Sequence, residues 1–506
     1  MQRELLHALD GACAAFGGAV AIVDACGSYS YTQLSTDADA IARALTANGA
    51  ALDEPVVVLV SNQARDWGAF LGAWRAGCVV VPVHRATAPG ALNGILGKTA
   101  ARFIIDGDPG KASLPADIAN GATTVCAGRL ARLDRPSPAP RPMLFDSAFV
   151  IFTSGSTGQP KGVVSTHGAW KKKLDAIDTI LRFERDTRVL VPLQITFAFG
   201  IWVSLLALTR GGTVLLHDRF EPKRVVATLA DAMVTHVAMV PTMLRALVAQ
   251  LDEPAVRSAI ARVNGAHLLR QLLTGGETLG ENLNRTLLDI FPGVGLYDIY
   301  GLTETTTSDF FLAPEDQPRH FGCIGRPSPG VRYRIANERG EQAAPGENGE
   351  LQILSDFIMR GYLDEPLLTA NAFVGEWFRT GDVGHVGEDG IVRLVGRSKE
   401  LISRGAVKIS PVEIEQIFGK HPGVAEVLVT GVPDALMGER IHILLIPKAG
   451  TSLSEDELRT WSRQWLERNR VPDVFHFGST LPLGRTGKAD RGRMREIVTA
   501  GGALGG

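Results

Sequence analysis

Apolar residues in the first part of the chain form short continuous runs separated by stretches with helical spacing. The runs Pro55–Val60 and Cys78–Val83 predict buried strands, and Trp67–Ala76, which Gly77 closes, predicts a helix between them. Two such strands joined by a helix form a βαβ unit, whose strands are parallel. The same pattern predicts strands at Ala148–Phe152, Thr213–Leu216, His236–Val240 and Leu272–Leu273. This part is therefore expected to be α/β with parallel-rich sheets.

The local structure of two further segments can be predicted. Tyr29–Tyr31 reads as a short strand, and Thr32 is expected to cap the helix that follows, because apolar residues recur after it at helical spacing. The 21 residues Val189–Thr209 are all uncharged, which is long enough to cross a bilayer. Pro192 and several polar residues interrupt this stretch and no basic cluster flanks it, so we predict a buried helix and no membrane span.

The pattern changes near Ile324. From there, short apolar runs are separated by turns rich in Gly and Glu, which predicts a small β-rich subdomain over residues 324–396. A charged segment, Arg397–Glu400, follows. The elements expected after it are a helix from about Pro411 and strands at Val424–Val429 and Ile441–Ile446. Together they predict a small C-terminal α+β domain of about 110 residues, within the usual size of an independent domain.

Composition narrows the class of function. The chain has 506 residues, 45% of them hydrophobic, which exceeds what one hydrophobic core usually supports, so two or more domains are expected. Its 52 basic and 54 acidic side chains give a net charge of -2, which argues against nucleic-acid or anionic-lipid binding and favours a small-molecule substrate. The five cysteines form no CxxC pair, and the N-terminus lacks a signal-peptide pattern. A cytoplasmic location is therefore expected.

The strongest candidate for chemistry is the segment from Thr153 to Gly162, TSGSTGQPKG, which follows an apolar strand. A loop rich in Gly, Ser and Thr lets backbone N–H groups surround phosphate oxygens, while hydroxyls and Lys161 add donors and positive charge. The spacing of Gly155 and Lys161 does not fit the Walker pattern GxxxxGK[ST]. A single loop of this kind also fits a surface turn, but phosphate binding is the favoured interpretation.

Further motifs follow this loop in a fixed order. They are Tyr300–Glu304 (YGLTE), Arg379–Asp382 (RTGD), Gly396-Arg397 and Pro482–Lys488. Together with the loop, their order resembles the acyl-adenylate-forming (AMP-binding) superfamily of acyl- and aryl-CoA ligases, peptide-synthetase adenylation domains and luciferases. The resemblance covers nearly the whole chain. It implies an enzyme that joins a carboxylic acid to ATP, releases pyrophosphate and passes the acyl group of the acyl-AMP to the thiol of coenzyme A.

The resemblance also implies which residues bind ATP. They are, around the β- and γ-phosphates, Thr153, Ser154, Gly155, Ser156, Thr157, Gly158 and Lys161; around adenine and the edge of the acyl pocket, Gly275, Gly276, Glu277, Asp298, Tyr300 and Gly301; and around the ribose and α-phosphate, Thr303, Asp382, Arg397 and Lys488. Tyr300 would stack on adenine, near whose amino group Asp298 would lie. Asp382 would accept both ribose hydroxyls, with Arg397 as its partner. Glu304 would hold Mg²⁺, a hard cation that prefers oxygen ligands.

The implied catalytic residues are Lys488, Thr303 and Glu304. Attack of a carboxylate on the α-phosphate brings two anions together, so a cation that contacts both, as Lys488 would, stabilises the transition state. For thiol transfer the family rotates a mobile C-terminal domain about a hinge. The implied divisions are an N-terminal domain over residues 1–396, a hinge over 397–401 with Lys399 as its pivot, and a mobile C-terminal domain over 402–506. A lysine at the pivot favours a CoA ligase over a peptide-synthetase domain.

One position departs from the family pattern. Ala406 stands in the loop after the hinge where relatives generally have glycine, and in those relatives this loop shapes the tunnel for the thiol. The neighbouring Gly405 is a candidate source of the flexibility that the loop needs.

The acyl pocket is expected around the segment Phe197–Trp202. Relatives that activate α-amino acids carry an aspartate at the position of Ala198, where it pairs with the substrate ammonium. Burying an ammonium without a counter-charge is costly, so an α-amino acid is not the expected substrate. The pocket residues are predicted to be Phe197, Ala198, Phe199, Trp202, Leu273 and Ile299. They suit an aryl or other apolar acid, although the aromatic residues are equally compatible with ordinary core packing.

Other functions remain compatible with these motifs. The segments Phe197–Gly200 and Asp298–Leu312 resemble benzoate-type CoA ligases more than long-chain fatty acid ligases. A stand-alone adenylation enzyme that loads the phosphopantetheine of an acyl carrier protein would use the same residues. The non-enzyme alternative, an ATP-binding regulator, is disfavoured because the charged residues of every motif are present.

Overall fold

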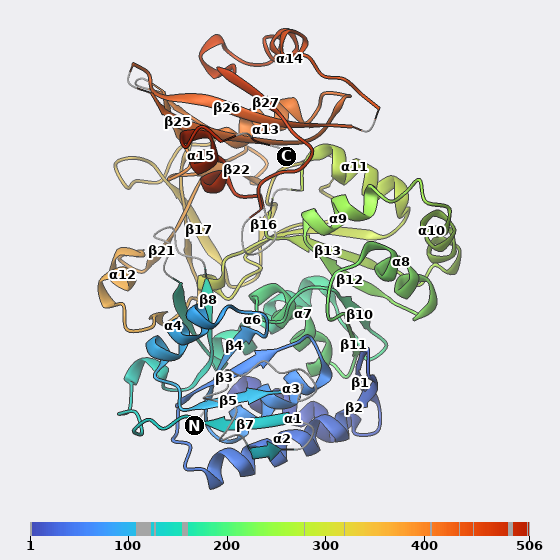
Figure 1. Ribbon diagram of the computed structural model, residues 1–506, viewed down its shortest axis with the longest axis vertical. Helices are drawn as coiled ribbons and strands as arrows, with labels where there is room; N and C mark the ends of the chain where they lie inside the picture. Colours follow the sequence, from blue (N-terminus) through green and yellow to red (C-terminus); the bar gives the residue numbers. More distant parts are fainter. Residues whose placement is uncertain are drawn as a thin grey trace.

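The structure of the chain is a computed structural model that describes residues 3–107, 123–125, 128–153, 160–277, 279–317, 319–404, 407–434, 436–448, 450–483, 489–502 and 504. Among these residues the strands form four sheets. Figure 1 shows the N-terminal elements at one end of the long axis and the elements after residue 401 at the other. The large N-terminal part with parallel-rich sheets and the smaller C-terminal domain confirm the predicted α/β fold class.

One large sheet carries the strands on either side of the candidate phosphate loop. Its described strands are, in spatial order, β19 (Gly361–Tyr362), β9 (Lys161–Thr166), β8 (Ser147–Thr153), β4 (Val79–His84), β3 (Pro55–Val60), β5 (Phe103–Asp106), β7 (Gly128–Arg132) and β6 (Thr123–Val125). α3 (Ala64–Arg75) connects the parallel neighbours β3 and β4, which confirms the predicted βαβ unit. β9 runs antiparallel to β8, and Thr153 pairs with Lys161 where the loop leaves the sheet.

The second large sheet carries the Tyr300 motif. Its described strands are, in order, β16 (Arg326–Pro327), β15 (Phe310–Leu312), β14 (Gly295–Tyr300), β13 (Gln271–Gly275), β12 (His236–Met239), β10 (Arg188–Val191), β11 (Thr213–Leu216), β1 (Val20–Asp24) and β2 (Gly27–Ser30). The strands from β14 to β1 are parallel, and β15, β16 and β2 are antiparallel additions at the edges. β14 therefore ends at Tyr300, the first residue of the motif Tyr300–Glu304.

Helices fill the space between the two large sheets and cover their outer faces. The largest hydrophobic cluster joins side chains of both sheets to α1 (Glu4–Phe16), α2 (Tyr31–Ala47), α3, α6 (His167–Leu181) and α7 (Ala198–Thr209). α4 (Pro89–Thr99) covers the outer face of the first sheet. The outer face of the second is covered by α8 (Pro222–Asp231), α9 (Pro241–Val248), α10 (Pro254–Ala266) and α11 (Glu281–Ile290).

Two smaller sheets complete the molecule. The third consists of β17 (Arg332–Ala336), β18 (Gly349–Leu354), β21 (Trp377–Val386), β20 (Phe373–Val374) and β22 (Val392–Arg397), with α12 (Pro366–Asn371) nearby in sequence. The fourth consists of β24 (Val407–Ile409), β23 (Ile402–Arg404), β26 (Gly438–Pro447), β25 (Val424–Asp434) and β27 (Val474–Phe477). α13 (Pro411–Phe418), α14 (Glu455–Ser462) and α15 (Arg491–Thr499) accompany it. The fourth sheet has its own hydrophobic cluster, as an independent domain requires.

Two local predictions need correction. Ser30 caps α2, not Thr32: the Ser30 hydroxyl accepts from the Gln33 N–H and the Gln33 side chain accepts from the Ser30 N–H, a complete capping box. The uncharged stretch Val189–Thr209 is not one helix, because β10 ends at Val191 and α7 begins only at Ala198. Pro192 explains the break, since proline cannot donate to a continuing strand or helix interior. No helix of the described residues is long and apolar enough to cross a membrane.

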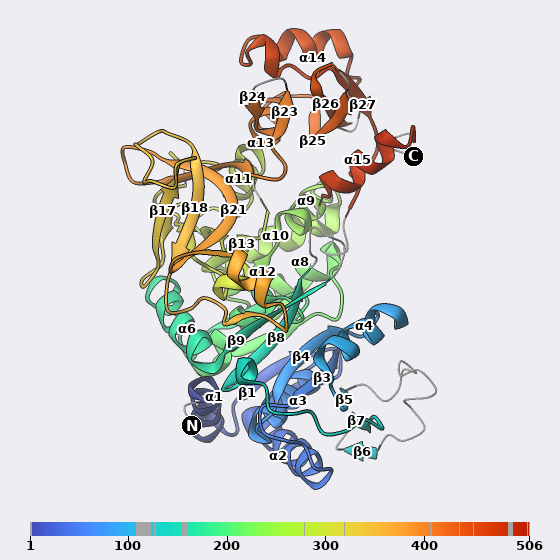
Figure 2. The same cartoon turned by 90° about the vertical axis from the view of Figure 1, so that its left-hand side faces the viewer.

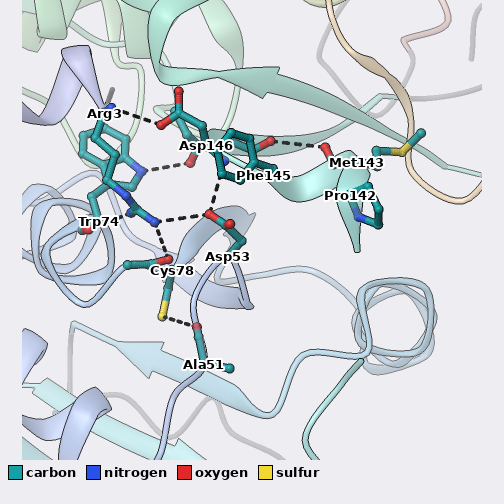
Figure 3. Close-up of polar contacts among 12 residues, drawn as sticks. Arg3, Ala51, Asp53, Trp74, Cys78, Pro142, Met143, Phe145 and Asp146 are labelled. Atoms are coloured by element: carbon teal, nitrogen blue, oxygen red, sulfur yellow. Dashed lines mark hydrogen bonds and ion pairs between the residues drawn. The ribbon is translucent and has the colours of Figure 1, made fainter. Parts of the chain in front are cut away.

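A polar network fixes the start of β8 to the N-terminus (Figure 3). The Arg3 guanidinium donates to Asp53 Oδ1 at 3.2 Å and to the Trp74 and Gly77 carbonyls at 3.0 and 2.7 Å. The Arg3 N–H donates to Asp146 Oδ1 at 3.0 Å. Because Asp146 immediately precedes β8, this network holds the strand that leads into the candidate phosphate loop.

Candidate active site

The best-defined cluster joins the second large sheet to the third sheet. The Tyr300 hydroxyl, at the end of β14, donates to Asp382 Oδ2 at 2.5 Å, and Arg397 Nε donates to Asp382 Oδ1 at 3.0 Å. Asp382 and Arg397 are direct partners across β21 and β22. Burial raises the pKa of Asp382, while the positive charge of Arg397 acts in the opposite direction. The structure thus brings together three residues of three different motifs, although Tyr300 and Arg397 are 97 positions apart in sequence (397 − 300).

The turn that follows Tyr300 carries Thr303 and Glu304. It forms a 3₁₀ helix, η2 (Thr303–Thr305), and the Met359 N–H donates to the Glu304 carbonyl at 2.6 Å. Gly301 is required here, because a Cβ at this position would lie 2.0 Å from the Ser308 nitrogen. The Glu304 carboxylate accepts from the Tyr362 hydroxyl at 2.9 Å.

Tyr362 also connects this turn to the candidate phosphate loop. Lys161 Nζ lies 5.3 Å from the centroid of the Tyr362 ring, within the range of a cation–π contact. Glu304, Tyr362 and Lys161 therefore form a chain of contacts from the turn to the first residue of β9. The residues Ser154, Gly155, Ser156, Thr157 and Gly158 lie outside the described part of the chain, as does Lys488.

Gly275 and its neighbours lie at the end of β13, beside β14. A Cβ on Gly275 would lie 2.2 Å from the Ile299 carbonyl oxygen, so glycine lets the two strands approach closely. The Glu277 carboxylate accepts from the Thr242 hydroxyl at 2.8 and 2.9 Å and pairs with Arg245 Nη1 at 3.2 Å. These contacts fix Glu277 to α9. Gly276 adopts φ +85°, which favours glycine.

Asp298 occupies the position on β14 that alternation places on the same face as Tyr300. Its in-register partner on β13 is Thr274. Burial raises the pKa of Asp298 to about 7, and the hydrogen bond from the Ile299 N–H lowers it by less. This carboxyl therefore changes charge near neutral pH.

The predicted pocket residues gather where α7 starts. The Phe199 and Trp202 rings are stacked, with centroids 5.6 Å apart and planes 13° apart, so the two share one side of the helix. Ala198 and Trp202 are buried, and Leu273 and Ile299 belong to the same hydrophobic cluster. Phe197 precedes the helix and remains 41% exposed. The structure thus brings most of these residues together around α7 and the adjoining strands.

Lys399 lies between β22 and β23, where the chain passes from the third sheet to the fourth. The Ser398 N–H donates to the Gly381 carbonyl at 2.8 Å, which fixes the segment to β21 next to Asp382. Gly405 and Ala406 are outside the described residues.

Sequence reasoning missed several residues of this region. Tyr362 lies outside every motif. Only its contacts with Glu304 and Lys161 in the structure identify it as part of the candidate site. The fully buried Lys173–Asp309 pair was also missed, because Lys173 lies in an amphipathic helix where lysine is usually solvent-exposed. No cluster of three or more His, Cys, Asp or Glu side chains suited to a metal occurs in the described ranges.

Comparison with known proteins assigns the family. The model of the AMP-binding enzyme family matches residues 9–363, and that of the AMP-binding enzyme C-terminal domain matches residues 413–488. The chain therefore belongs to the AMP-binding enzyme family. The adenylate-forming ligase class that the order of the motifs predicted is thereby confirmed.

Relatives from the same family and one solved structure of the same fold are similar to this chain. It is 32% identical to a feruloyl-CoA synthase from Amycolatopsis sp over 92% of this chain and 93% of the relative. It is 30% identical to a fatty acid–[acyl-carrier-protein] ligase from Streptomyces coeruleorubidus over 92% of this chain and 91% of the relative. A benzoate CoA ligase from Burkholderia xenovorans shares the fold, with a TM-score of 0.82, 24% identity and coverage of 97% and 99% of the two chains.

Proposed function

We propose that this ligase activates an aryl or other apolar carboxylic acid and transfers the acyl group to coenzyme A. The observation that carries the proposal is the convergence of Tyr300, Asp382 and Arg397 beside the turn that bears Glu304. These side chains offer an aromatic face, a buried acceptor with a cationic partner, and a carboxylate. Such a set matches the purine, the vicinal hydroxyls and the metal-bound phosphates of ATP.

Nucleotide binding would use the two oxygens of Asp382. An ionised carboxylate accepts hydrogen bonds only, and a ribose offers two hydroxyl donors side by side. The Arg397 guanidinium at 3.0 Å supports the charged form of Asp382 despite its burial. The ring of Tyr300 would stack on adenine, because aromatic faces favour offset contact with planar rings. Asp298, on the same face of β14, would meet the adenine amino group.

Glu304 would hold Mg²⁺ without a dedicated protein cage. Tyr362 donates to one oxygen of Glu304, which leaves the other oxygen as a candidate ligand. Mg²⁺ commonly binds through one or two carboxylates together with substrate phosphates and waters, so the lack of a larger cluster among the described residues fits this cation. When bound, Mg²⁺ would neutralise phosphate charge. Thr303 would donate to the α-phosphate, and Lys488 would contact the attacking carboxylate.

The acid is inferred from the residues at the start of α7. Ala198 offers no counter-charge to an ammonium, and the stacked Phe199 and Trp202 present an apolar wall. The names of a feruloyl-CoA synthase and a benzoate CoA ligase, both similar to this chain, support an aromatic acid. Acceptance of a fatty acid is the second candidate, because the fatty acid–[acyl-carrier-protein] ligase is nearly as similar.

The acceptor is proposed to be coenzyme A, with a carrier-protein phosphopantetheine as the alternative. Both present the same thiol on the same arm. Several relatives, among them the feruloyl-CoA synthase, carry CoA in their names, whereas one named relative acts on a carrier protein.

Pyrophosphate release measured against a panel of acids tests the proposed substrate. The panel contains benzoate-like acids, medium-chain fatty acids and α-amino acids at matched concentration, each with CoA, with a holo carrier protein and with neither. We expect fastest release with an aryl acid and thioester formation on CoA. Best turnover on a fatty acid would refute the aryl preference. Best turnover on an α-amino acid would refute the use of Ala198 to assign the pocket.

A further inference from the structure

A fully buried ion pair lies beneath the turn that bears Thr303 and Glu304. Lys173 Nζ on α6 lies 2.8 Å from Asp309 Oδ1, and neither side chain is exposed to solvent. Lys173 Nζ also lies 3.5 Å from the Ser308 carbonyl oxygen and 4.7 Å from the centroid of the Phe357 ring. The cation therefore contacts the end of the turn and the segment that passes beside it.

Asp309 holds the turn at both of its ends. Its Oδ2 accepts from the hydroxyl of Thr305, the last residue of η2. The Thr305 oxygen in turn accepts from the N–H of Leu302, the residue before η2, at 3.3 Å. The Asp309 N–H donates to the Tyr300 carbonyl at 2.7 Å. Thr303 and Glu304 lie between these anchors, so one charged group sets the backbone that carries both.

The backbone after η2 is strained. Thr306, Thr307 and Ser308 have φ of 56°, 61° and 54°, three consecutive residues other than glycine in the left-handed region. Thr306 and Ser308 are completely buried. Residues in such conformations persist only where the surrounding structure fixes them, and they cluster at functional sites. The contacts of Asp309 with Thr305 and Tyr300, and of Lys173 with Ser308, are suited to fix this turn.

Stability alone does not account for the pair. Removing two charges from water offsets most of their attraction, and apolar residues of similar volume often replace a buried ion pair without loss of stability. What apolar residues cannot supply is a hydrogen-bond acceptor for the Thr305 hydroxyl, which itself holds the Leu302 N–H. The pair also joins the turn to α6, which follows β9 and thereby the candidate phosphate loop.

We propose that Lys173 and Asp309 are positioning residues that set Thr303 and Glu304 in the geometry required for acid activation. This inference rests on the proposed function, in which those two residues meet the α-phosphate and Mg²⁺. Neither Lys173 nor Asp309 touches the substrates. A shift of the turn by about 1 Å is enough to lower the rate about 10²-fold, because catalysis depends on the alignment of reacting groups.

The test compares three variants of the full-length enzyme. Lys173→Met/Asp309→Leu replaces the pair by apolar side chains, and Thr305→Val removes only the hydroxyl that donates to Asp309. The matched control, Arg102→Met/Glu54→Leu, replaces another buried pair, with an N–O distance of 2.7 Å, that contacts Gly49 instead of the turn. Each variant is assayed for thermal unfolding, for acid-dependent pyrophosphate exchange over a range of Mg²⁺ concentrations, and for calorimetric binding of AMP and of ATP with and without Mg²⁺.

We expect the Lys173/Asp309 double variant to unfold within a few degrees of the wild type. Its exchange kcat should fall about 10²-fold, and its need for Mg²⁺ should rise, with the KM for the acid little changed. It should bind AMP normally but lose the gain in ATP affinity that Mg²⁺ gives the wild type. Thr305→Val should show a smaller effect of the same kind, and the Arg102/Glu54 control should show none.

Two results overturn different parts of this account. Wild-type kcat and Mg²⁺ dependence in a folded Lys173/Asp309 double variant, or in Thr305→Val, would refute the positioning role and leave the proposed function standing. Absence of acid-dependent exchange in the wild-type enzyme would refute the proposed function itself.

Discussion

Burial dominates the pKa of Asp298, whereas Asp382 is paired with Arg397. Asp298 lies two residues before Tyr300 on β14, and burial raises its pKa from 3.8 to about 7. Between about pH 4 and pH 7 the folded protein therefore retains a proton that the unfolded chain has lost. Because the unfolded state then binds fewer protons, the free energy of unfolding decreases as the pH rises through this window.

Asp298→Asn should remove this dependence. The slope that one carboxyl contributes is at most about 1.4 kcal/mol per pH unit, since one proton is involved. Thermal unfolding of the ligand-free protein at pH 5 and pH 8 measures the effect. The wild type should lose more stability than the variant between these two pH values. An identical change in both proteins would show that Asp298 ionises normally.

Single residues can be proposed from the sequence where they belong to a motif, but not where they act through distant contacts. Tyr300, Asp382 and Arg397 were identified from the order of motifs, and the structure brings them into contact. The roles assigned to them stay predictions. Tyr362 and Lys173 could not be found in this way, because their partners Glu304 and Asp309 lie 58 and 136 positions away in sequence. Nothing in the local pattern indicates which distant carboxylate a buried tyrosine or lysine meets.

Elements were predicted where apolar runs are long and their ends carry clear signals. The parallel strands of both large sheets follow from such runs, because a strand buried on both faces is apolar throughout. The helix cap was placed two residues late because Ser30 and Thr32 both suit the position, and only the reciprocal bonds with Gln33 decide between them. The prediction of one helix over Val189–Thr209 was wrong because apolar content alone does not distinguish a strand from a helix.

The start of α7 offers a prediction at the scale of the element. In Ala198→Asp the new carboxylate would occupy the first helical residue, where the helix dipole favours negative charge by about 0.3–1 kcal/mol. Burial of Ala198 in an apolar cluster costs an ionised carboxylate more than that. We expect a folded protein whose kcat/KM for its best apolar acid falls at least about tenfold, as the loss of roughly 1.4 kcal/mol requires.

Ala198→Asn is the control, because it matches the volume of aspartate without its charge. Steady-state pyrophosphate release with the best acid compares the two variants. The asparagine variant should retain more activity than the aspartate variant. Wild-type kcat/KM in Ala198→Asp would show that this residue does not face the bound acid.

At the scale of the whole molecule, polar groups at the start of α11 contact the residues that follow α13 in the C-terminal domain. Asn282 of α11 donates to the Gly419 carbonyl, and Lys420 Nζ lies 3.5 Å from Glu281. Figure 2 shows α11 next to α13 of the C-terminal domain. Arg491 at the start of α15 pairs with Glu400 of the hinge segment at 3.1 Å and with Glu415 of α13 at 2.5 Å. The pair with Glu415 joins α15 to α13, so we propose that the residues after the hinge, 402–506, move as one body.

Substitution of the proposed pivot should separate the two half-reactions. Proline fixes φ near −65°, so Lys399→Pro should restrict rotation and slow thiol transfer while leaving acid activation measurable. Lys488→Ala should do the reverse: it should slow activation by about 10² to 10³ and spare transfer from supplied acyl-AMP. Single-turnover rates of each half-reaction provide the comparison, with Lys399→Ala as a flexible control. Equal slowing of both steps by Lys399→Pro would argue against a pivot at this residue.

The central claim is that the enzyme forms an acyl-AMP reversibly before any thiol is involved. Exchange of labelled pyrophosphate into ATP, measured without CoA, tests this claim most directly. The account predicts exchange that depends on both Mg²⁺ and an aryl acid and that disappears when the acid is omitted. Formation of ADP from ATP, or an absence of exchange with every acid of the panel until CoA is added, would contradict it.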